Sequence, residues 1–181
     1  MLIVGLGNPP DQYGSTRHNA GYWFVDLWAH SEGLQWRYEK KCDAWIAKNS
    51  SVFLIKPSCF INLSSGPIRK TQRYFNLENR TLVVAHDEMS FLPGVIRFKE
   101  NGGAGGHNGL KDIISHIGEN FMRIRIGIGS PNHPNVSDYV LSNPAVHEKN
   151  SINESLANLI AQKEKILEEN WPFLMNNWHQ S

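Results

Sequence analysis

Short apolar runs of about strand length recur along the chain, and they constrain its fold more than any other feature. Residues 2–6 and 81–85 are rich in Leu, Ile and Val, which is typical of strands that are buried on both faces. The first run ends at Gly7-Asn8-Pro9-Pro10, where two consecutive prolines prevent its extension. Because stretches with helical periodicity separate such runs, the sequence predicts an α/β fold.

The remaining pattern predicts the elements that complete one layered sheet. Short strands are predicted at 35–39, 43–48 and 51–56, and the stretches between them are too short for helices, so we expect hairpins or a meander. This indicates a mixed, mostly parallel twisted sheet flanked by helices. Further strands are predicted at 95–99 and 122–128, and helices at 21–33, 64–75, 108–117 and from about 144 to 170.

The length of 181 residues and the hydrophobic content of 40% are ordinary for one domain, so we expect a single domain over 1–181 with a C-terminal helical segment from about 144. No apolar run approaches the roughly 18 residues of a membrane-spanning helix, and the N-terminus lacks a basic leader region. We therefore expect a cytoplasmic protein with no membrane partner. Cys42 and Cys59 form no CxxC pair, which predicts neither a disulfide framework nor a zinc site.

The formal net charge of +1 does not by itself indicate a nucleic-acid binder. Affinity for phosphates comes from clustered Lys and Arg, so the local distribution of charge decides whether RNA can bind. Basic residues concentrate in two stretches, namely Arg69, Lys70, Arg73 and Arg80, and then Arg97, Lys99, Lys111, Arg123 and Arg125. The stretch from residue 144 onward is by contrast mildly acidic.

His18 and Asp87 are the candidate catalytic residues. His18 lies between a predicted strand and a predicted helix, and an imidazole with an unperturbed pKa of about 6.5 is a competent base near neutral pH. Asp87 follows directly on a buried strand, where its carboxylate could fix the tautomer of a histidine and stabilise its protonated form. The residues alone leave two plainer interpretations open, a loop histidine and a capping aspartate.

Three asparagines lie at corresponding places, Asn8 beside the first strand, Asn62 after the third short strand, and Asn108 at a helix start. Side-chain amides both donate and accept hydrogen bonds, so a group of them can bind a peptide-like substrate and stabilise a developing oxyanion without charge. Each asparagine alone also fits a turn or a helix cap.

Several common site types lack their motifs in this chain. Residues 102–109 are glycine-rich but lack the Lys-Ser/Thr ending of a P-loop, and Gly5-Leu6-Gly7 lacks the third glycine of a dinucleotide fingerprint. Neither GxSxG nor HExxH is present, and nothing beside Cys59 in the sequence would activate its thiol. We therefore expect no cofactor and no metal ion.

Taken together, the motifs from Leu2 to about Leu141 resemble those of the bacterial-type peptidyl-tRNA hydrolase family. The resemblance is carried, in order along the chain, by Val4-Gly5-Leu6-Gly7-Asn8-Pro9, Tyr13, Thr16-Arg17-His18-Asn19-Ala20-Gly21, Lys56-Pro57, Phe60, Asn62-Leu63-Ser64, Ala85-His86-Asp87-Glu88, Gly105-Gly106-His107-Asn108-Gly109-Leu110-Lys111-Asp112 and Arg123-Ile124-Arg125-Ile126-Gly127-Ile128-Gly129. The sequence departs from the family pattern at Pro10, Cys59, Ile61, Ser65 and Asn101, and none of these changes removes a reactive group.

The resemblance implies a function and a role for each candidate residue. It implies that His18 activates a hydrolytic water, that Asp87 keeps His18 basic, and that a monomer binds peptidyl-tRNA without a protein partner. The asparagines would bind the substrate, and Asn8 would help to distinguish an N-blocked aminoacyl group from a free one. Residues expected to bind substrate are Asn8, Tyr13, Phe60, Asn62 and Asn108, with Tyr13 and Phe60 in the cleft for the tRNA 3′ end and the peptide.

Hydrolysis of the ester between a peptide and the 3′ end of tRNA is the primary hypothesis. Arg97, Lys99, Lys111 and Arg125 are expected to contact phosphates of the acceptor arm. The sequence leaves two alternative hypotheses open. One is a noncatalytic RNA-binding module, and the other is a metal-dependent hydrolase built on His18, Asp87 and His107.

Overall fold

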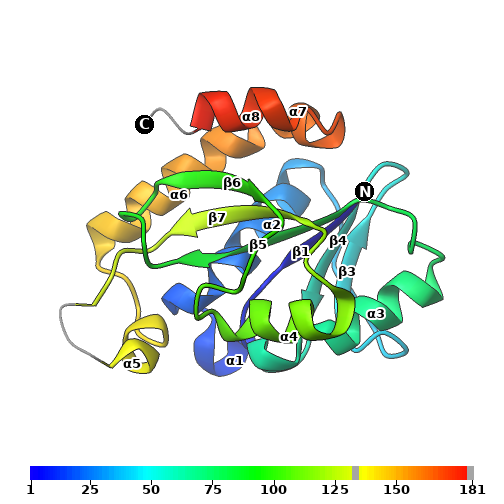
Figure 1. Cartoon of the computed structure of the whole chain (residues 1–181), viewed down its shortest axis with the longest axis horizontal. Coiled ribbons are helices and arrows are strands. Elements are labelled where there is room, and N and C mark those ends of the chain that lie inside the picture. Colours follow the sequence, from blue (N-terminus) through cyan, green and yellow to red (C-terminus); the bar gives the residue numbers. More distant parts are fainter. Residues whose placement is uncertain (132–134, 179–181) are drawn as a thin grey trace.

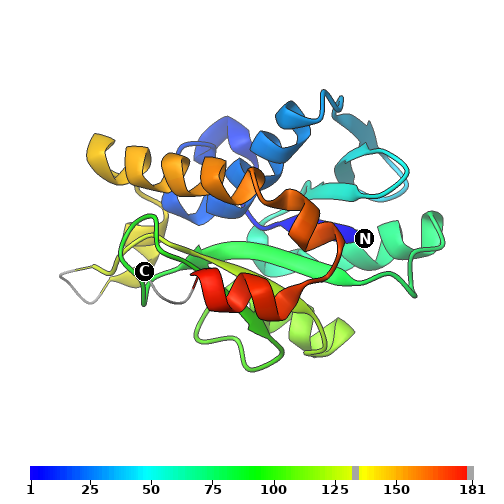
Figure 2. The ribbon, with the colours of Figure 1, turned by 90° about the horizontal axis from the view of Figure 1, so that it is seen from above.

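The computed structural model of the chain describes residues 1–131 and 135–178. In this part of the chain, one seven-stranded sheet in the order β2-β3-β4-β1-β5-β7-β6 is covered by helices on both faces (Figures 1 and 2). The predicted α/β class and mixed sheet are therefore confirmed.

The four central strands, β4, β1, β5 and β7, are parallel to one another, and the outer strands pair with their neighbours in antiparallel fashion. The predicted meander is the antiparallel edge β2-β3-β4, and β6 closes the other edge by pairing with β7. The strands are β1 (Leu2–Gly5), β2 (Arg37–Glu39), β3 (Ala44–Lys48), β4 (Phe53–Pro57), β5 (Leu82–Glu88), β6 (Ile96–Glu100) and β7 (Met122–Gly127).

Two apolar cores lie on opposite faces of the sheet. One face carries α2 (Ala20–Ser31), α6 (Val146–Ile160), α7 (Lys163–Leu167) and α8 (Trp171–Trp178), and its core includes the fully buried Trp28. The opposite face carries α3 (Ser65–Tyr74) and α4 (Asn108–Ile117), which pack against each other and over residues such as Val84. The central strands are buried from both sides, which explains their continuous apolar runs.

The C-terminal segment differs from the single helical stretch expected from about 144 to 170. Helix α6 ends at Ile160, α7 is a separate short helix, and α8 continues beyond the predicted end. The breaks let α8 return to the sheet edge, where Trp171 packs against Phe98 of β6 with ring centroids 6.4 Å apart. Tertiary packing therefore determines this part of the chain more than local periodicity.

Very short helices were also absent from the sequence prediction, because one turn has no measurable periodicity. These are α1 (Pro10–Tyr13), the 3₁₀ turns η1 (Arg17–Asn19) and η2 (Ile61–Leu63), and α5 (Val136–Val140). Among the described residues, no helix is long and apolar enough to cross a membrane.

A close approach between α2 and the sheet brings η1 to the strand ends. A side chain on Gly21 would collide with the backbone oxygen of Ala85, and one on Gly5 would collide with the backbone of Gly21. Only glycine permits this spacing, which places the turn before α2 directly beside the carboxyl ends of β1 and β5. Ligands of open α/β sheets gather at such strand ends.

Candidate functional site

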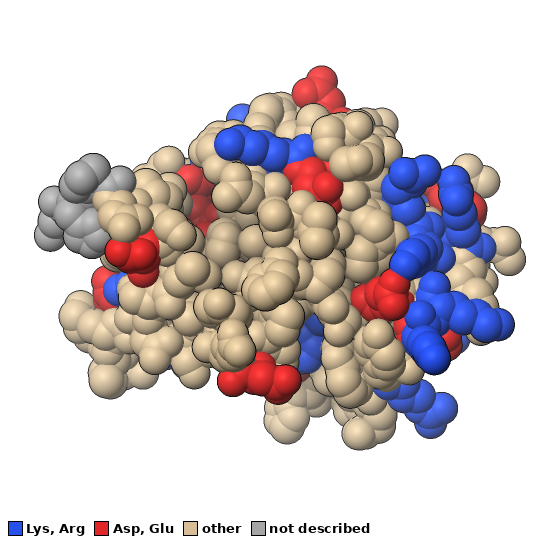
Figure 3. All heavy atoms as spheres, turned by 90° about the horizontal axis from the view of Figure 1, so that it is seen from below, with Lys and Arg blue, Asp and Glu red and all other residues tan. Residues whose placement is uncertain are grey.

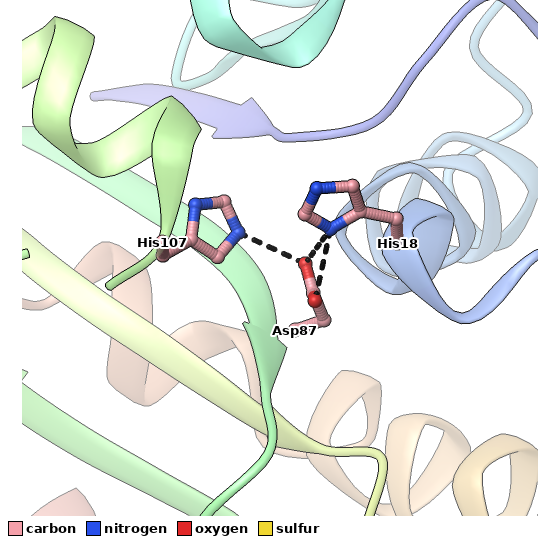
Figure 4. Close-up of side chains that lie close together, drawn as sticks. All are labelled: His18, Asp87 and His107. Atoms are coloured by element: carbon pink, nitrogen blue, oxygen red, sulfur yellow. Dashed lines mark hydrogen bonds and ion pairs between the residues drawn. The ribbon is translucent and has the colours of Figure 1, made fainter. Parts of the chain in front are cut away.

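Three segments far apart in the sequence bring His18, Asp87 and His107 into contact (Figure 4). His18 comes from η1, Asp87 is the penultimate residue of β5, and His107 is the N-cap of α4. The Nδ1 atom of His18 lies 2.9 Å from both carboxylate oxygens of Asp87. The Nε2 atom of His107 lies 2.9 Å from Oδ1 of the same carboxylate, so Asp87 bridges the two rings.

The cap of α4 fixes the tautomer of His107. Its Nδ1 accepts hydrogen bonds from the backbone N–H groups of Gly109 at 3.1 Å and Leu110 at 3.3 Å. An accepting nitrogen carries no proton, so the ring proton of the neutral imidazole is on Nε2 and is donated to Asp87. His107 thus links the start of α4 to the candidate catalytic carboxylate.

Asp87 in turn determines which ring nitrogen of His18 carries the proton, and it also shifts the pKa of this ring. Nδ1–H of His18 donates to Asp87, which leaves Nε2, on the far side of the ring, with a lone pair (Figure 4). Burial alone would lower the pKa of His18, but the negative charge and hydrogen bond of Asp87 outweigh it and hold this pKa above its ordinary value. Burial opposes ionisation of Asp87 as well, yet the two rings hold its pKa far below the usual range.

His86, directly before Asp87, is a third histidine at this site, and it is buried. Its Nδ1–H donates to the backbone oxygen of Asp87 at 2.7 Å, and its ring lies 5.1 Å from that of His107. Burial is the main cause that lowers the pKa of His86 to about 3, so it is neutral at physiological pH. It therefore adds no positive charge beside the carboxylate.

The same three residues are the one group of potential metal ligands among the described residues, with candidate atoms within 4.8 Å of one another. A metal ion would need the lone pair of Nε2 of His107, whereas that nitrogen carries the proton donated to Asp87. Moving the proton to Nδ1 would break the cap of α4. The hydrogen bonds of His107 therefore fit a proton-positioning triad better than a metal site.

Asn8 is held in one orientation by its neighbours. Its Oδ1 accepts a hydrogen bond from the backbone N–H of Ile61 at 2.8 Å. Its backbone N–H donates to Oδ1 of Asn19, and its backbone oxygen accepts from Nδ2 of Asn19, both at 2.9 Å. With the side-chain oxygen engaged, the NH₂ group of Asn8 is the part that can meet a ligand, and it can only donate.

Asn19 and Arg17, the two neighbours of His18 in the chain, also support the site, and these roles were not predicted from the sequence. Asn19 is fully buried and fixes the loop that carries Asn8. Arg17 is buried and donates to Oγ of Ser142 at 2.7 Å and to Glu148 at 2.6 Å, while its guanidinium stacks on Tyr139 at 4.3 Å. Their partners are distant in the sequence, so no local pattern could reveal these roles.

A cleft of about 400 Å³ opens beside the triad. It contains both candidate catalytic residues and all three predicted asparagines, and Met89, Val140 and Leu141 line it with apolar surface. Phe60 lines the cleft and is 52% exposed. Tyr13, which was predicted in the same cleft, does not line it, but packs edge-on against Phe60 with ring centroids 6.3 Å apart.

The four residues predicted to contact phosphates fall into two groups, two arginines that are bound within the protein and two exposed lysines. Arg97 and Arg125 face each other across β6 and β7, but Arg125 is bound to Glu88 at 3.0 Å and Arg97 donates to the backbone oxygen of Trp178. Both guanidinium groups also lie over Phe91. Lys99 is exposed on β6, and Lys111 is exposed in the first turn of α4.

Known proteins resemble this chain along its whole length. The family described as peptidyl-tRNA hydrolase matches residues 2–181. A peptidyl-tRNA hydrolase of Dichelobacter nodosus is 41% identical over 93% of this chain and 92% of the relative. That of Methylococcus capsulatus is 39% identical over 98% of each chain. The crystal structure of peptidyl-tRNA hydrolase from Acinetobacter baumannii, 37% identical, covers 97% of this chain and 92% of its own with a TM-score of 0.91. The resemblance seen in the motifs is thus confirmed, and the chain belongs to the peptidyl-tRNA hydrolase family.

Proposed function

We propose that this chain hydrolyses the ester bond between a peptide, or an N-blocked aminoacyl group, and the 3′ end of tRNA, with His18 as general base. Family membership supports the reaction. The observation that carries the mechanism is the bridging of His18 and His107 by Asp87 at the wall of a cleft. Released tRNA would be free for reuse in translation.

The reaction can be written with water as nucleophile. Nε2 of His18 takes a proton from water as the oxygen attacks the ester carbonyl, and the resulting imidazolium is stabilised by Asp87. The tetrahedral intermediate collapses with cleavage of the bond to the ribose oxygen. The proton on His18 passes to that oxygen, which restores the 3′ hydroxyl group and the neutral base. General base catalysis of this kind contributes about 10² to 10⁴ in rate.

Asn108 is the residue we assign to the water or the developing oxyanion. It lines the cleft as the first residue of α4, directly beside His107. The next two backbone N–H groups of the helix are used by Nδ1 of His107 and cannot bind an oxyanion at the same time. The side-chain amide of Asn108 is therefore one of the donors at this helix start that remain available.

The remaining cleft residues would bind the substrate on either side of the ester. Asn8 and Asn62 present amides to the peptide backbone, and Phe60, against which Tyr13 packs, provides an apolar surface. As the family resemblance implies, we also propose that the protein is a cytoplasmic monomer that acts without a cofactor or protein partner. Sedimentation of the purified protein would test the oligomeric state.

One assay separates this proposal from its alternatives. Purified protein is incubated with N-acetyl-aminoacyl-tRNA, with and without EDTA, beside the His18→Ala variant. We expect cleavage that EDTA does not affect and a loss of at least about 10² in kcat for the variant. Salt-sensitive binding without turnover would instead indicate an RNA-binding module, and inhibition by EDTA would indicate a metal-dependent hydrolase.

A further inference from the structure

Positive charge on this protein gathers away from the cleft. Figure 3 shows Lys and Arg side chains collected toward one end of the molecule, where α3 and the β2–β3 edge lie. We define the α3 basic surface as the exposed residues of this region that contact or flank one another, namely Lys40, Lys41, Arg69, Lys70 and Arg73. The cleft and its triad do not use any of these residues.

The pattern of α3 explains why its basic residues point outward. Pro67, Ile68 and Thr71 are buried against the sheet, so the other side of the helix faces solvent. Arg69 and Arg73 are four positions apart, which places their side chains on the same helix face with Cβ atoms about 5 to 6 Å apart. The side chains of both arginines thus leave the helix on one face and line the same groove.

These two arginines have no internal partner among the described residues. Lys70 is paired with Asp43, and Lys41 lies 5.2 Å over the ring of Tyr74, whereas neither Arg69 nor Arg73 makes a hydrogen bond or an ion pair within the described part of the chain. A planar guanidinium with free donors matches the geometry of a phosphate group.

The two arginines line a shallow groove of about 210 Å³ between α3 and α4. His116 of α4 lines the same groove, and Glu78 is the one carboxylate there. The groove therefore keeps an excess of positive charge, in contrast to the β6–β7 arginines, whose guanidinium groups are already bound within the protein.

Helix α4 connects this groove to the cleft. Its first residue, Asn108, lines the cleft, Lys111 is exposed one turn later, and His116 borders the groove near the other end. A helix of ten residues spans about 15 Å, which is well within the length of an RNA acceptor stem. An RNA whose 3′ end enters the cleft can therefore follow α4 to the α3 basic surface.

We propose that the α3 basic surface binds the phosphodiester backbone of the substrate RNA beyond its 3′ end, with Arg69 and Arg73 as the main contacts. This inference rests on the proposed function. The surface contributes to substrate binding through charge and takes no part in the chemical step, so its loss raises KM and leaves kcat unchanged.

The test compares two substrates of different length. The double variant Arg69→Gln with Arg73→Gln is assayed on N-acetyl-aminoacyl-tRNA and on the same N-acetyl-aminoacyl group esterified to the trinucleotide CCA. We expect a several-fold higher KM for the tRNA and an unchanged KM for CCA. The slope of log KM against log salt for the tRNA should fall in magnitude by up to about 1.8, since each lost phosphate contact contributes about 0.9.

A matched control removes two charges elsewhere. Lys163→Gln with Lys165→Gln alters α7, which lies on the opposite face of the sheet, and should leave both KM values unchanged (Figure 1). An unchanged KM for tRNA in the arginine variant, or an equal rise for both substrates, would overturn the inference. If the wild-type protein cleaved neither substrate, the proposed function would fail, and binding of deacylated tRNA by the same variants would still test this surface.

Discussion

We propose that the orientation of one side-chain amide, that of Asn8, determines which aminoacyl groups bind. Its oxygen accepts a hydrogen bond from the backbone N–H of Ile61, so its NH₂ group is the part that can meet a ligand. A donor can bind the carbonyl oxygen of a blocked aminoacyl group, but it cannot accept a hydrogen bond from the ammonium of a free one. Discrimination between blocked and free aminoacyl groups would therefore come from two effects. The NH₂ group of Asn8 pairs favourably with the carbonyl oxygen of the blocked group and unfavourably with the ammonium of the free one.

We predict graded effects, in the same direction, for two substitutions at Asn8. Asn8→Ala should narrow the preference for blocked over free aminoacyl-tRNA, because the donor is lost. Asn8→Asp should narrow it further, because one carboxylate oxygen can still accept from Ile61 while the other attracts the ammonium. The ratio of the two kcat/KM values measures the preference, and an unchanged ratio in both variants would contradict the assigned role.

At the scale of elements, the start of α4 combines a structural and a positioning role in one residue. His107 caps the helix through Nδ1 and orients Asp87 through Nε2. The two roles can be separated, because an asparagine at an N-cap accepts the same backbone hydrogen bonds but is too short to replace the distant ring nitrogen.

His107→Asn should therefore keep the cap and lower kcat. Both His107→Asn and His107→Ala lose the hydrogen bond to Asp87, but His107→Ala should have a free energy of unfolding lower by about a further 1 kcal/mol, because only it lacks the cap. Urea denaturation and steady-state kinetics on the same samples give the two quantities. Equal activity in the asparagine variant and the wild type would show that the contact with Asp87 is not needed.

Arg17 connects η1 to α5, through Tyr139, and to the first turn of α6, through Glu148. The side chain of Arg17 is only 9% exposed and that of Glu148 19%, so removing one charge leaves the other buried without its partner. We predict that Arg17→Gln lowers the free energy of unfolding by about 3 kcal/mol, and that Glu148→Gln added to it restores part of the loss. Thermal unfolding of the two single variants and the double variant forms the cycle, and strictly additive losses would refute the coupling.

At the scale of the whole molecule, local features could be predicted from the sequence, whereas contacts between distant segments could not. Buried central strands and the meander were predictable because their residue patterns are local and periodic. The meeting of His18, Asp87 and His107 depends on sheet order, which local periodicity does not encode. The predicted strand at 81–85 also continues through Asp87 to Glu88, because β7 pairs with it over that length despite the polar side chains.

Charge is another property that emerges only in the folded molecule. The formal net charge of +1 gives no indication of the α3 basic surface, which is formed by five basic residues from two segments of the chain. The sequence marked Arg69 and Arg73 as part of a basic stretch, but the groove that they form with α4 requires the packing of two helices. Conversely, the sequence predicted that Arg97 and Arg125 contact phosphates, but in the structure their guanidinium groups are bound within the protein.

We propose that His18 acts as a base and that Asp87 determines both its tautomer and the direction in which its pKa is shifted. Neutral His18 is required, so kcat/KM should fall as the pH drops below the pKa of His18, which the charge of Asp87 raises. Asp87→Asn removes the negative charge and should lower that pKa. The acid limb of the profile should then move to lower pH.

The most direct measurement is the pH profile of kcat/KM on N-acetyl-aminoacyl-tRNA for the wild type and Asp87→Asn. We predict a loss of about 10² to 10⁴ at the plateau, because the tautomer of His18 is no longer enforced, together with the shift of the acid limb to lower pH. An acid limb that stays at the same pH in the variant, with activity near that of the wild type, would contradict the account.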